Sequence, residues 1–463
     1  MFKENNPQFT SHNTPLTDDQ LRDRERWMME VGNWREDHLS PSAGEHYRYL
    51  WKWDETKGDV INARRGDPDR ASTGLKTLLK YIDTSTGFNP NKIFATATNK
   101  TWRDYPEAWN FNDNTVGSSY TQPPLEAWAA IETYQSYVQS GREQEGLDFL
   151  NDIYGTAETG NYTGLKGGYA YFINHRQNSP DDPLVGIVHP NETGRDSDEA
   201  NKPWLAYSDK NSYDAKLEWL KMQKFGWDIG QLGRDSQKKR VDWIPEQVRE
   251  KYWVNDVMFN SLYAQNLRYL SNIADILYKS TNDTKQQELY ETDKEFYSVT
   301  ANTVEEQILN RMWDPEHGFF YNLDKDSESK IPVDSATGLF PLILENIELE
   351  QITALTDKLE DPNWFGTQFP IPTHAVRSKF YDPEPSWFKN KFTPQWSGTV
   401  WANVNMIIGE ALAERAESFS DIKNENYNPD LTVRLIGNAG IIASKTHEML
   451  AINPKSMEYY SPI

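Results

Sequence analysis

The chain has 463 residues and a formal net charge of -22, from 48 Lys and Arg against 70 Asp and Glu. This charge argues against nucleic acid as a partner, because a phosphate backbone calls for a basic surface. The sequence has no cysteine, which excludes disulfides, thiolate metal sites and a cysteine nucleophile.

Aromatic residues are abundant, with 17 Trp, 24 Tyr and 19 Phe. Most of these rings are expected to pack between helices, but exposed Trp and Tyr also suit carbohydrate, whose apolar C–H faces stack on rings. The first residues, MFKENNPQFT, lack the apolar core of a signal peptide, and no run of about 18 apolar residues occurs. We therefore expect a cytoplasmic protein without a membrane span.

The first predicted helix follows a capping box. Thr17 and Gln20 have the required spacing, and an apolar pattern continues to Val31 before Gly32 ends it. The next stretch, residues 46–59 (HYRYLWKWDETKGD), is too aromatic and too irregular in period to indicate a helix or a strand. We predict that it is a loop that presents its rings.

The remaining helices are predicted from apolar spacing of three and four residues and from Pro or Gly at their ends. We expect them at about 67–82, 123–138, 147–154, 168–176, 213–225, 267–277, 285–312, 341–352, 404–412 and 431–450.

This order of elements predicts an all-α fold. Helical hairpins joined by long aromatic loops would gather those loops at one end as a site. A repeat solenoid is the competing architecture, but no fixed period of 20 to 50 residues is found, which favours a closed toroid. We expect one catalytic domain over 1–463, with the polar stretch 197–252 as an insertion or lid within it.

The stretch 189–199 (HPNETGRDSDE) carries the densest set of candidate catalytic groups. Four of its eleven residues are carboxylates, namely Glu192, Asp196, Asp198 and Glu199. Gly194 allows a sharp turn, and crowded carboxylates raise one another's pKa, which is how a general acid is made. A solvated acidic loop is the alternative interpretation.

Five blocks of the sequence resemble segments of glycoside hydrolase family 63, especially its bacterial mannosylglycerate and glucosylglycerate hydrolases. The blocks are LWKWD (50–54), TQPPLEAWA (121–129), HPNETGRD (189–196), FPIPTHA with WSGTVWANVN (369–375 and 396–405) and MEYYSP (457–462). They look like that family's Trp-x-Trp-Asp, Gln-Pro-Pro, Glu-Ser/Thr-Gly-x-Asp, Ile-Pro with Trp-x-Gly-x-Val-Trp-x-Asn-x-Asn, and Glu-Tyr-Tyr segments. Each block is weak alone, but the five keep the family's order over nearly the whole chain.

The resemblance implies an (α/α)6 toroid with long aromatic loops and an inverting α-glycosidase, with Asp196 as general acid and Glu458 as general base. Inverting hydrolysis needs one protonated carboxyl and one ionised carboxylate, about 6.5 to 9.5 Å apart. The crowded Asp196 suits the first role, and Glu458, which has no acidic neighbour in sequence, suits the second. No metal or organic cofactor is implied.

The resemblance also implies residues that bind the substrate. Those expected around the cleaved sugar are Trp51, Trp53, Asp54, Gln122, Gly194 and Trp396, with Tyr47 near the aglycone. Arg240 is the candidate cation for a glycerate carboxylate, with Arg103 and Arg234 as alternatives.

Several of these residues have a second interpretation. Gln122 equally suits a cap of its own helix, Asp54 a residue that fixes its loop, and Glu192 a partner of the acid or the acid itself. Trp128 and Trp401 are expected in the core, and His189 and His374 are expected to be structural hydrogen-bonding groups.

We therefore expect an enzyme that hydrolyses a small α-glucoside or α-mannoside, with a glycerate conjugate as the leading candidate. The alternatives are a non-catalytic carbohydrate-binding protein of the same fold and a trehalase-like α-toroid hydrolase. The oligomeric state is left open. The family has a further helix after Glu-Tyr-Tyr, whereas this sequence ends at Ile463. Two interpretations stay open: a toroid that lacks its last helix, and a C-terminally truncated form of a longer protein.

Overall fold

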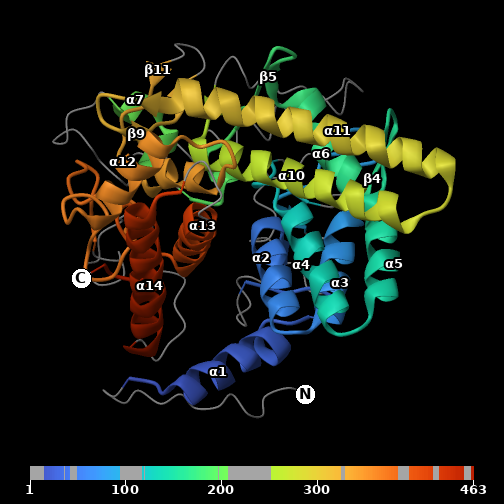
Figure 1. Ribbon diagram of the computed structural model, residues 1–463, viewed down its shortest axis with the longest axis horizontal. Coiled ribbons are helices and arrows are strands. Elements are labelled where there is room, and N and C mark those ends of the chain that lie inside the picture. Colours follow the sequence, from blue (N-terminus) through green and yellow to red (C-terminus); the bar gives the residue numbers. More distant parts are fainter. Residues whose placement is uncertain are drawn as a thin grey trace, which may run out of the picture.

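The computed structural model of the protein describes residues 15–35, 37–41, 49–93, 117–118, 120–196, 198–206, 252–324, 329–383, 396–420, 427–452 and 460–462. Helices dominate these residues (Figure 1). The α-helices are α1 (Asp18–Trp27), α2 (Lys52–Arg64), α3 (Pro68–Leu79), α4 (Glu126–Gln139), α5 (Glu143–Tyr154), α6 (Gly164–His175), α7 (Pro203–Ala206), α10 (Val257–Ser280), α11 (Thr284–Gln307), α12 (Leu349–Glu360), α13 (Ala402–Ser420) and α14 (Pro429–Ile452).

The strands are short and lie between the helices. They are β1 (Leu50–Trp51), β2 (Lys92–Ile93), β3 (Thr156–Glu158), β4 (Asn161–Thr163), β5 (Gln177–Ser179), β6 (Asp182–Val185), β7 (Val254–Asn255), β8 (Trp313–Asp314), β9 (Phe319–Phe320), β10 (Leu323–Asp324) and β11 (Ser329–Lys330). Every pairing between them is antiparallel, and the largest sheet has the order β11-β10-β7. These strands connect loops to one another, and among the described residues they form no sheet layer beside the helices. The predicted all-α class is therefore confirmed.

Helices α2, α4, α10 and α13, together with the 3-10 helix Ala336–Ile343, form an inner ring. Helix α2 packs against α4, α4 against α10, α10 against the 3-10 helix, and the 3-10 helix against α13. Helices α3, α5, α11 and α14 each follow an inner helix and pack against it as an antiparallel partner (Figure 1). The fold is therefore a ring of helical hairpins.

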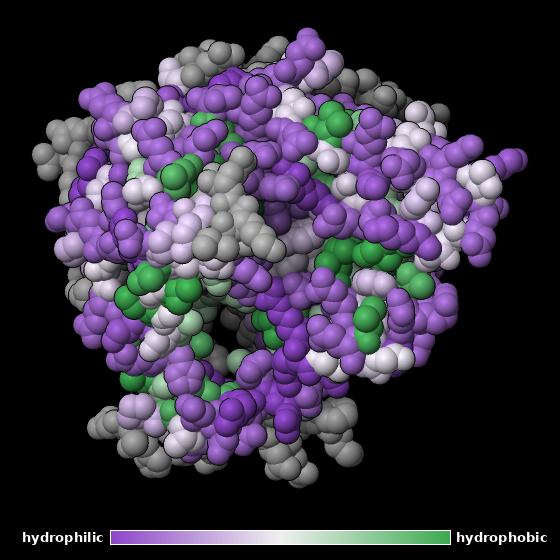
Figure 2. Space-filling view, in the orientation of Figure 1, coloured by the Kyte–Doolittle hydropathy of each residue, from purple (hydrophilic) through white to green (hydrophobic). Residues whose placement is uncertain are grey.

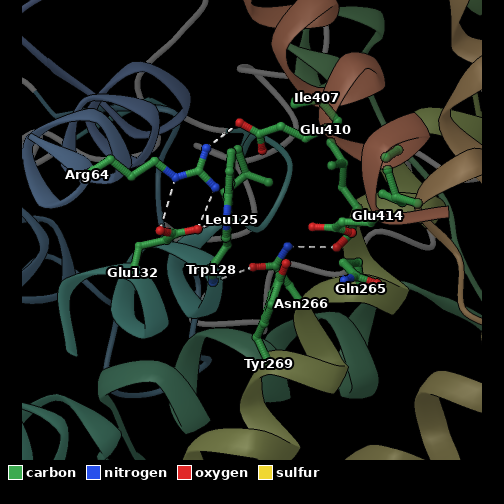
Figure 3. Close-up of a pocket in the computed structure, with 13 residues that line it drawn as sticks. Arg64, Leu125, Trp128, Glu132, Gln265, Asn266, Tyr269, Ile407, Glu410 and Glu414 are labelled. Atoms are coloured by element: carbon green, nitrogen blue, oxygen red, sulfur yellow. Dashed lines mark hydrogen bonds and ion pairs between the residues drawn. The ribbon is translucent and has the colours of Figure 1, made fainter. Parts of the chain in front are cut away.

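The gap between the first and last inner helices is bridged by Arg64, at the end of α2 (Figure 3). Its guanidinium donates to both carboxylate oxygens of Glu132 on α4, at 2.6 and 3.0 Å, and also pairs with Glu410 on α13. Beside it, the main-chain amide of Trp128 on α4 donates to Oδ1 of Asn266 on α10 at 2.9 Å. These groups line a small cavity of about 60 Å³, and they join the inner helices α2, α4, α10 and α13 around it.

The prediction of a loop at 46–59 is wrong from residue 50 onward. Leu50 and Trp51 pair with β2, and α2 begins at Lys52. The helix shows no apolar stripe because neighbours cover most of its surface, so polar and apolar residues are buried alike. Its buried residues are Lys52, Trp53, Glu55, Thr56, Gly58, Asp59, Val60, Asn62 and Ala63.

Other predicted helices are closer to the structure. Thr17 and Gln20 form the capping box of α1, with main-chain to side-chain distances of 3.3 and 2.9 Å. The helix predicted to begin at Pro341 is instead split, because Pro341 lies inside the 3-10 helix and α12 begins only at Leu349. The helix predicted at 213–225 lies outside the described residues.

One hydrophobic cluster extends through the ring from Leu50 to Ile442. In the orientation of Figure 2 the surface is mainly hydrophilic, and it is hollowed between the side of α13 and α14 and the side of α2 and α3. None of the described helices is long and apolar enough to cross a membrane. The single domain over 1–463 stays a prediction, and most of the proposed lid, 207–251, lies outside the described residues.

Candidate active site

The acidic stretch folds as a short 3-10 helix, Pro190–Thr193, that ends at Gly194. Gly194 has a φ of 72° in the left-handed region, which favours glycine. A Cβ at this position would also lie 3.3 Å from the indole ring of Trp53. The turn therefore needs a glycine, and it brings the next residues against the start of α2.

Glu192 holds this turn in place. Its carboxylate is fully buried and pairs with Arg176 at 2.6 and 2.9 Å. It also accepts hydrogen bonds from the main-chain amides of Thr121, at 3.1 Å, and Val188, at 2.8 Å. A carboxylate with this many donors is a structural anchor.

Asp198 is occupied in the same way on the other side of the turn. Burial would raise its pKa, but the charge of Arg195 and the hydrogen bond from His374 lower it to about 2. Arg195 pairs with both Asp198 and Asp256, so its side chain binds two carboxylates that lie outside the cavity.

Asp198, Glu199 and His374 form a buried cluster whose ligand atoms lie within 4.8 Å of one another, close enough to hold a metal ion. The cluster already contains positive charge, because Arg195 pairs with Asp198 and because Asp198 and Glu199 raise the pKa of His374 against the effect of its burial. Glu199 also accepts from the Ser397 hydroxyl at 3.0 Å. We interpret the cluster as an ion-pair network that fixes the acidic stretch 189–199, which we call the acid loop. The expectation of no metal stays a prediction.

A cavity of about 380 Å³ opens beside this loop, and Asp196 is the acid-loop carboxylate that lines it. The other described residues around the cavity are Asn33, Leu39, Ser40, Pro41, Trp51, Trp53, Asp54, Lys57, Gly58, Ile61, Asn91, Tyr120, Gln122, Gly194, Trp396, Trp401, Ala402 and Asn403. This set includes every predicted site residue that the structure describes. Tyr47, Arg240 and Glu458 lie outside the described residues.

Asp196 combines access to water with a raised pKa. Its side chain is exposed within the cavity, while the surrounding protein displaces much of the water that would solvate its charge. This desolvation, and secondly the negative charge of Asp54, raise the pKa of Asp196 to about 7. A carboxyl of this kind is protonated in a large fraction of molecules at neutral pH.

Buried polar groups hold the start of α2, which forms one wall of the cavity, in its position. The main-chain amide of Trp53 donates to Oε1 of Gln122 at 2.9 Å, so Gln122 caps α2 and not its own helix. The Lys52 ammonium is buried, pairs with Glu126 at 3.0 Å and donates to the Gln122 carbonyl at 3.2 Å. These bonds place the Trp-x-Trp-Asp block against the Gln-Pro-Pro block.

Two indoles form the facing wall. Trp396 and Trp401 stack with their centroids 3.9 Å apart and their planes 13° apart. Trp401 belongs to the hydrophobic core, as expected, and it also lines the cavity. Val400, which lies between these two residues in the sequence, pairs with Tyr460 through main-chain hydrogen bonds of 2.7 and 2.9 Å. This pairing holds Tyr460 next to the indole wall. Trp128 lines the small cavity beside Arg64 instead.

Sequence reasoning missed several lining residues, chiefly Lys57 and Tyr120. Lys57 follows Trp53 and Asp54 by four and three positions, so recognising α2 as a helix would have placed it on their face. Its ammonium lies 3.6 Å from Asp54 and 4.4 Å from the Trp53 ring centroid. Tyr120 stacks on His189 at 4.8 Å, and burial, followed by the charge of Asp196, raises its pKa well above the usual value.

Residues 47–462 match the mannosylglycerate hydrolase MGH1-like glycoside hydrolase domain. The chain belongs to this family. Its resemblance to glycoside hydrolase family 63 is thereby confirmed, and it is a glycoside hydrolase homologue over nearly its whole length.

Relatives within the family are distant. The chain is 24% identical over 384 residues to a mannosylglycerate hydrolase of Thermus thermophilus, covering 80% of this chain and 82% of that protein. It is 23% identical over 411 residues to one of Rubrobacter radiotolerans, covering 82% of each.

Solved structures of this family share the fold. A family 63 mannosylglycerate hydrolase of Thermus thermophilus in complex with Tris matches with a TM-score of 0.67 at 20% identity, over 96% of this chain and 94% of that one. Structures of that enzyme with Tris and D-glycerate and with glucose each match with a TM-score of 0.66. The ring of hairpins is therefore an (α/α)6 toroid, as predicted.

Proposed function

We propose that this protein is an inverting α-glycosidase of the cytoplasm that hydrolyses a small α-glucoside or α-mannoside, with a glycerate conjugate as the leading substrate. The observation that carries the proposal is the position of Asp196. It is the carboxyl of the acid loop that faces the cavity, and its pKa is raised to about 7. A protonated carboxyl that reaches a sugar-sized cavity suits a general acid that donates to the leaving oxygen.

The walls support a sugar as the occupant. The indole rings of Trp51, Trp53, Trp396 and Trp401 border the cavity, and indole rings stack on the apolar side of a pyranose ring. Asp54 and Gln122 add a carboxylate and an amide that are able to bind hydroxyl groups. Apolar faces with a few fixed polar groups are the usual composition of a small-molecule site.

Glu458 is the proposed general base. Tyr460, two residues later in the sequence, pairs through its main chain with Val400, which precedes Trp401 of the cavity wall. The proposal requires the two carboxyl groups to lie about 6.5 to 9.5 Å apart, so that a water molecule fits between the base and the sugar.

The glycerate part of the proposal has its support in the relatives. Two relatives of the chain are mannosylglycerate hydrolases, and a family 63 mannosylglycerate hydrolase of Thermus thermophilus was solved in complex with Tris and D-glycerate and in complex with glucose. Arg240 stays the predicted partner of a glycerate carboxylate. Lys57 is the one cation among the described residues that line the cavity.

The proposal is tested with a panel of α-linked glucosides and mannosides that includes glucosylglycerate and mannosylglycerate, followed by proton NMR. We expect hydrolysis of at least one member, with the β-anomer of the free sugar appearing first. Early appearance of the α-anomer would contradict inversion. Absence of hydrolysis with retained sugar binding would favour the non-catalytic alternative.

A further inference from the structure

Four residues that line the sugar cavity come from a segment ahead of the family match. The match begins at residue 47, whereas residues 33–35 and 37–41, which we call the N-terminal wall, contribute Asn33, Leu39, Ser40 and Pro41 to the cavity. None of them belongs to the blocks that carry the family resemblance. One side of the cavity is therefore formed by residues that lie outside the matched domain of the family.

The N-terminal wall has a defined shape. Trp34 and Leu39 form an antiparallel bridge. The amide of Arg35 donates to the His38 carbonyl at 2.8 Å, and the amide of Ser40 donates to the Asn33 carbonyl at 2.8 Å. These bonds close a tight hairpin whose two ends, Asn33 and Ser40, both reach the cavity.

The hairpin is docked on α2 by contacts that depend on particular residues. The Leu39 amide donates to Oε2 of Glu55 at 2.8 Å, and this carboxylate is buried. The Leu39 side chain fills the space above Gly58, where any Cβ would overlap it. A glycine on an inner helix is therefore needed to seat the wall, and the wall is held where α2 presents Asp54 and Lys57 to the cavity.

The preceding segment is anchored at the opposite side of the gap in the ring. The amide of Leu16 donates to the carbonyl of Ala451 on α14 at 2.9 Å, and Arg24 donates to the carbonyl of Leu450 at 3.1 Å. In Figure 1, α1 lies across the end of the molecule below α14 and α2. The N-terminal wall is thus tied to both sides of the hollow and is part of the folded toroid.

Asn33 contributes a side-chain amide to this wall. Its Nδ2 donates weakly to the Pro41 carbonyl, at 3.4 Å, while no described residue donates to its Oδ1. An amide oxygen that lines a cavity without an internal donor accepts a hydrogen bond from water or from a ligand hydroxyl.

We propose that the N-terminal wall determines sugar specificity, with Oδ1 of Asn33 accepting a hydrogen bond from a hydroxyl group of the bound pyranose. This proposal rests on the proposed function only in taking the cavity to be a sugar site. Asn33 acts on binding, and the acid and base do the chemistry.

The test measures the binding of glucose and of mannose by calorimetry, with no need for turnover. We expect Asn33→Leu to raise the dissociation constant of whichever sugar binds more tightly by roughly threefold to tenfold, because one neutral hydrogen bond is lost. Asn33→Asp keeps an acceptor oxygen but loses the donor to Pro41, so it should bind nearly as well as the wild type. The matched control is Asn282→Leu, the same substitution at an exposed position between α10 and α11 that does not line the cavity.

The outcomes separate the two proposals. Equal binding by Asn33→Leu and the wild type would overturn the role of the wall, whether or not the enzyme is active. Equally weak binding by Asn33→Leu and Asn33→Asp would show that Asn33 only shapes the hairpin. A wild type that binds sugar without hydrolysing any glycoside would contradict the catalytic proposal alone. A wild type that binds neither sugar would contradict both.

Discussion

The main-chain amide of Trp53 donates a 2.9 Å hydrogen bond to the side chain of Gln122, although the two residues are 69 positions apart. Both residues line the cavity, and Lys52 reinforces the contact by donating to the Gln122 carbonyl. The start of α2 and the segment before α4 therefore form one rigid corner of the site. Rigid corners of this kind keep catalytic geometry within the narrow limits that proximity requires.

Substitution of Gln122 by Ala should loosen this corner. We expect the free energy of unfolding to fall by about 1 kcal/mol, because a buried amide loses its acceptor, and kcat/KM to fall by roughly tenfold to hundredfold because the indole moves. Gln122→Glu retains an acceptor oxygen and should keep most of the stability. Urea unfolding and initial rates measure the two effects. An unchanged kcat/KM in the Ala variant would show that Gln122 does not position the site.

Substitution of Asp196 by Asn should remove the proton donor. We expect kcat to fall by roughly 10²- to 10⁴-fold with an unchanged melting temperature, because the side chain is exposed within the cavity. Glu458→Gln should have a comparable effect on kcat. Asp148→Asn, at an exposed position on α5, is the matched control. Full activity in either site variant would remove that residue from the mechanism.

The pH dependence of the wild type should reflect the same carboxyl group. Asp196 must be protonated to act as an acid, and its pKa is raised to about 7. We therefore expect kcat/KM to fall as pH rises through about 7, with protonated enzyme active below this value. Asp54→Asn removes the nearby negative charge that raises this pKa, and it should move the alkaline limb to lower pH. A shift in the opposite direction would contradict the coupling between the two carboxyl groups.

Glu55 and Asp59 form a second acidic pair, buried on α2 away from the cavity lining. Their side chains interact with each other through a hydrogen bond, and Oε2 of Glu55 also accepts from the Leu39 amide. Burial raises the pKa of both groups well above the usual values. Because the folded-state pKa values exceed the unfolded ones, the stabilisation is fully present below the unfolded values and is lost as pH rises through the folded values.

Asp59→Asn should therefore weaken the loss of stability at alkaline pH. Urea unfolding at about pH 5 and about pH 8.5 measures this slope for the wild type and the variant. The control is Asp23→Asn, at an exposed position of α1, which should keep the wild-type slope. Identical slopes in wild type and Asp59→Asn would show that the pair does not titrate in this range.

Arg64 should stabilise the closure of the ring. Its side chain is 38% exposed, so we expect Arg64→Met to lower the free energy of unfolding by only about 1 kcal/mol, less at high salt. A double-mutant cycle with Glu410→Gln isolates the bond between α2 and α13. Arg22→Met, which removes an exposed ion pair within α1, is the control. A coupling energy of zero would show that this ion pair does not contribute to closure.

Local patterns in the sequence were sufficient for the acid loop and for most helices. The turn at Gly194 and the capping box at Thr17 depend on residues a few positions apart, and the structure contains both of them. The all-α class could be predicted because apolar residues spaced by three and four positions indicate helices that have one buried face. The family resemblance then supplied the toroid, which spacing alone left open.

Contacts between distant residues could not be predicted in this way. Helix α2 was mistaken for a loop because it is buried on most of its surface and shows no periodic stripe. The capping of α2 by Gln122 and the seating of Leu39 over Gly58 join segments whose proximity only the tertiary fold creates. The separate duties of the four acid-loop carboxylates depend on their distant partners, such as Arg176 for Glu192 and His374 for Asp198.

The bond between Arg64 and Glu410 spans 346 positions of sequence. Closing so long a segment costs chain entropy before the contact contributes anything, and topologies dominated by such contacts fold slowly. During synthesis, an emerging chain that has passed Arg64 still lacks α13 and the indole wall at 396–401. The cavity is therefore completed only after residues 396–401 have been synthesised, and a nascent chain must keep the apolar faces of its early hairpins from aggregating until then.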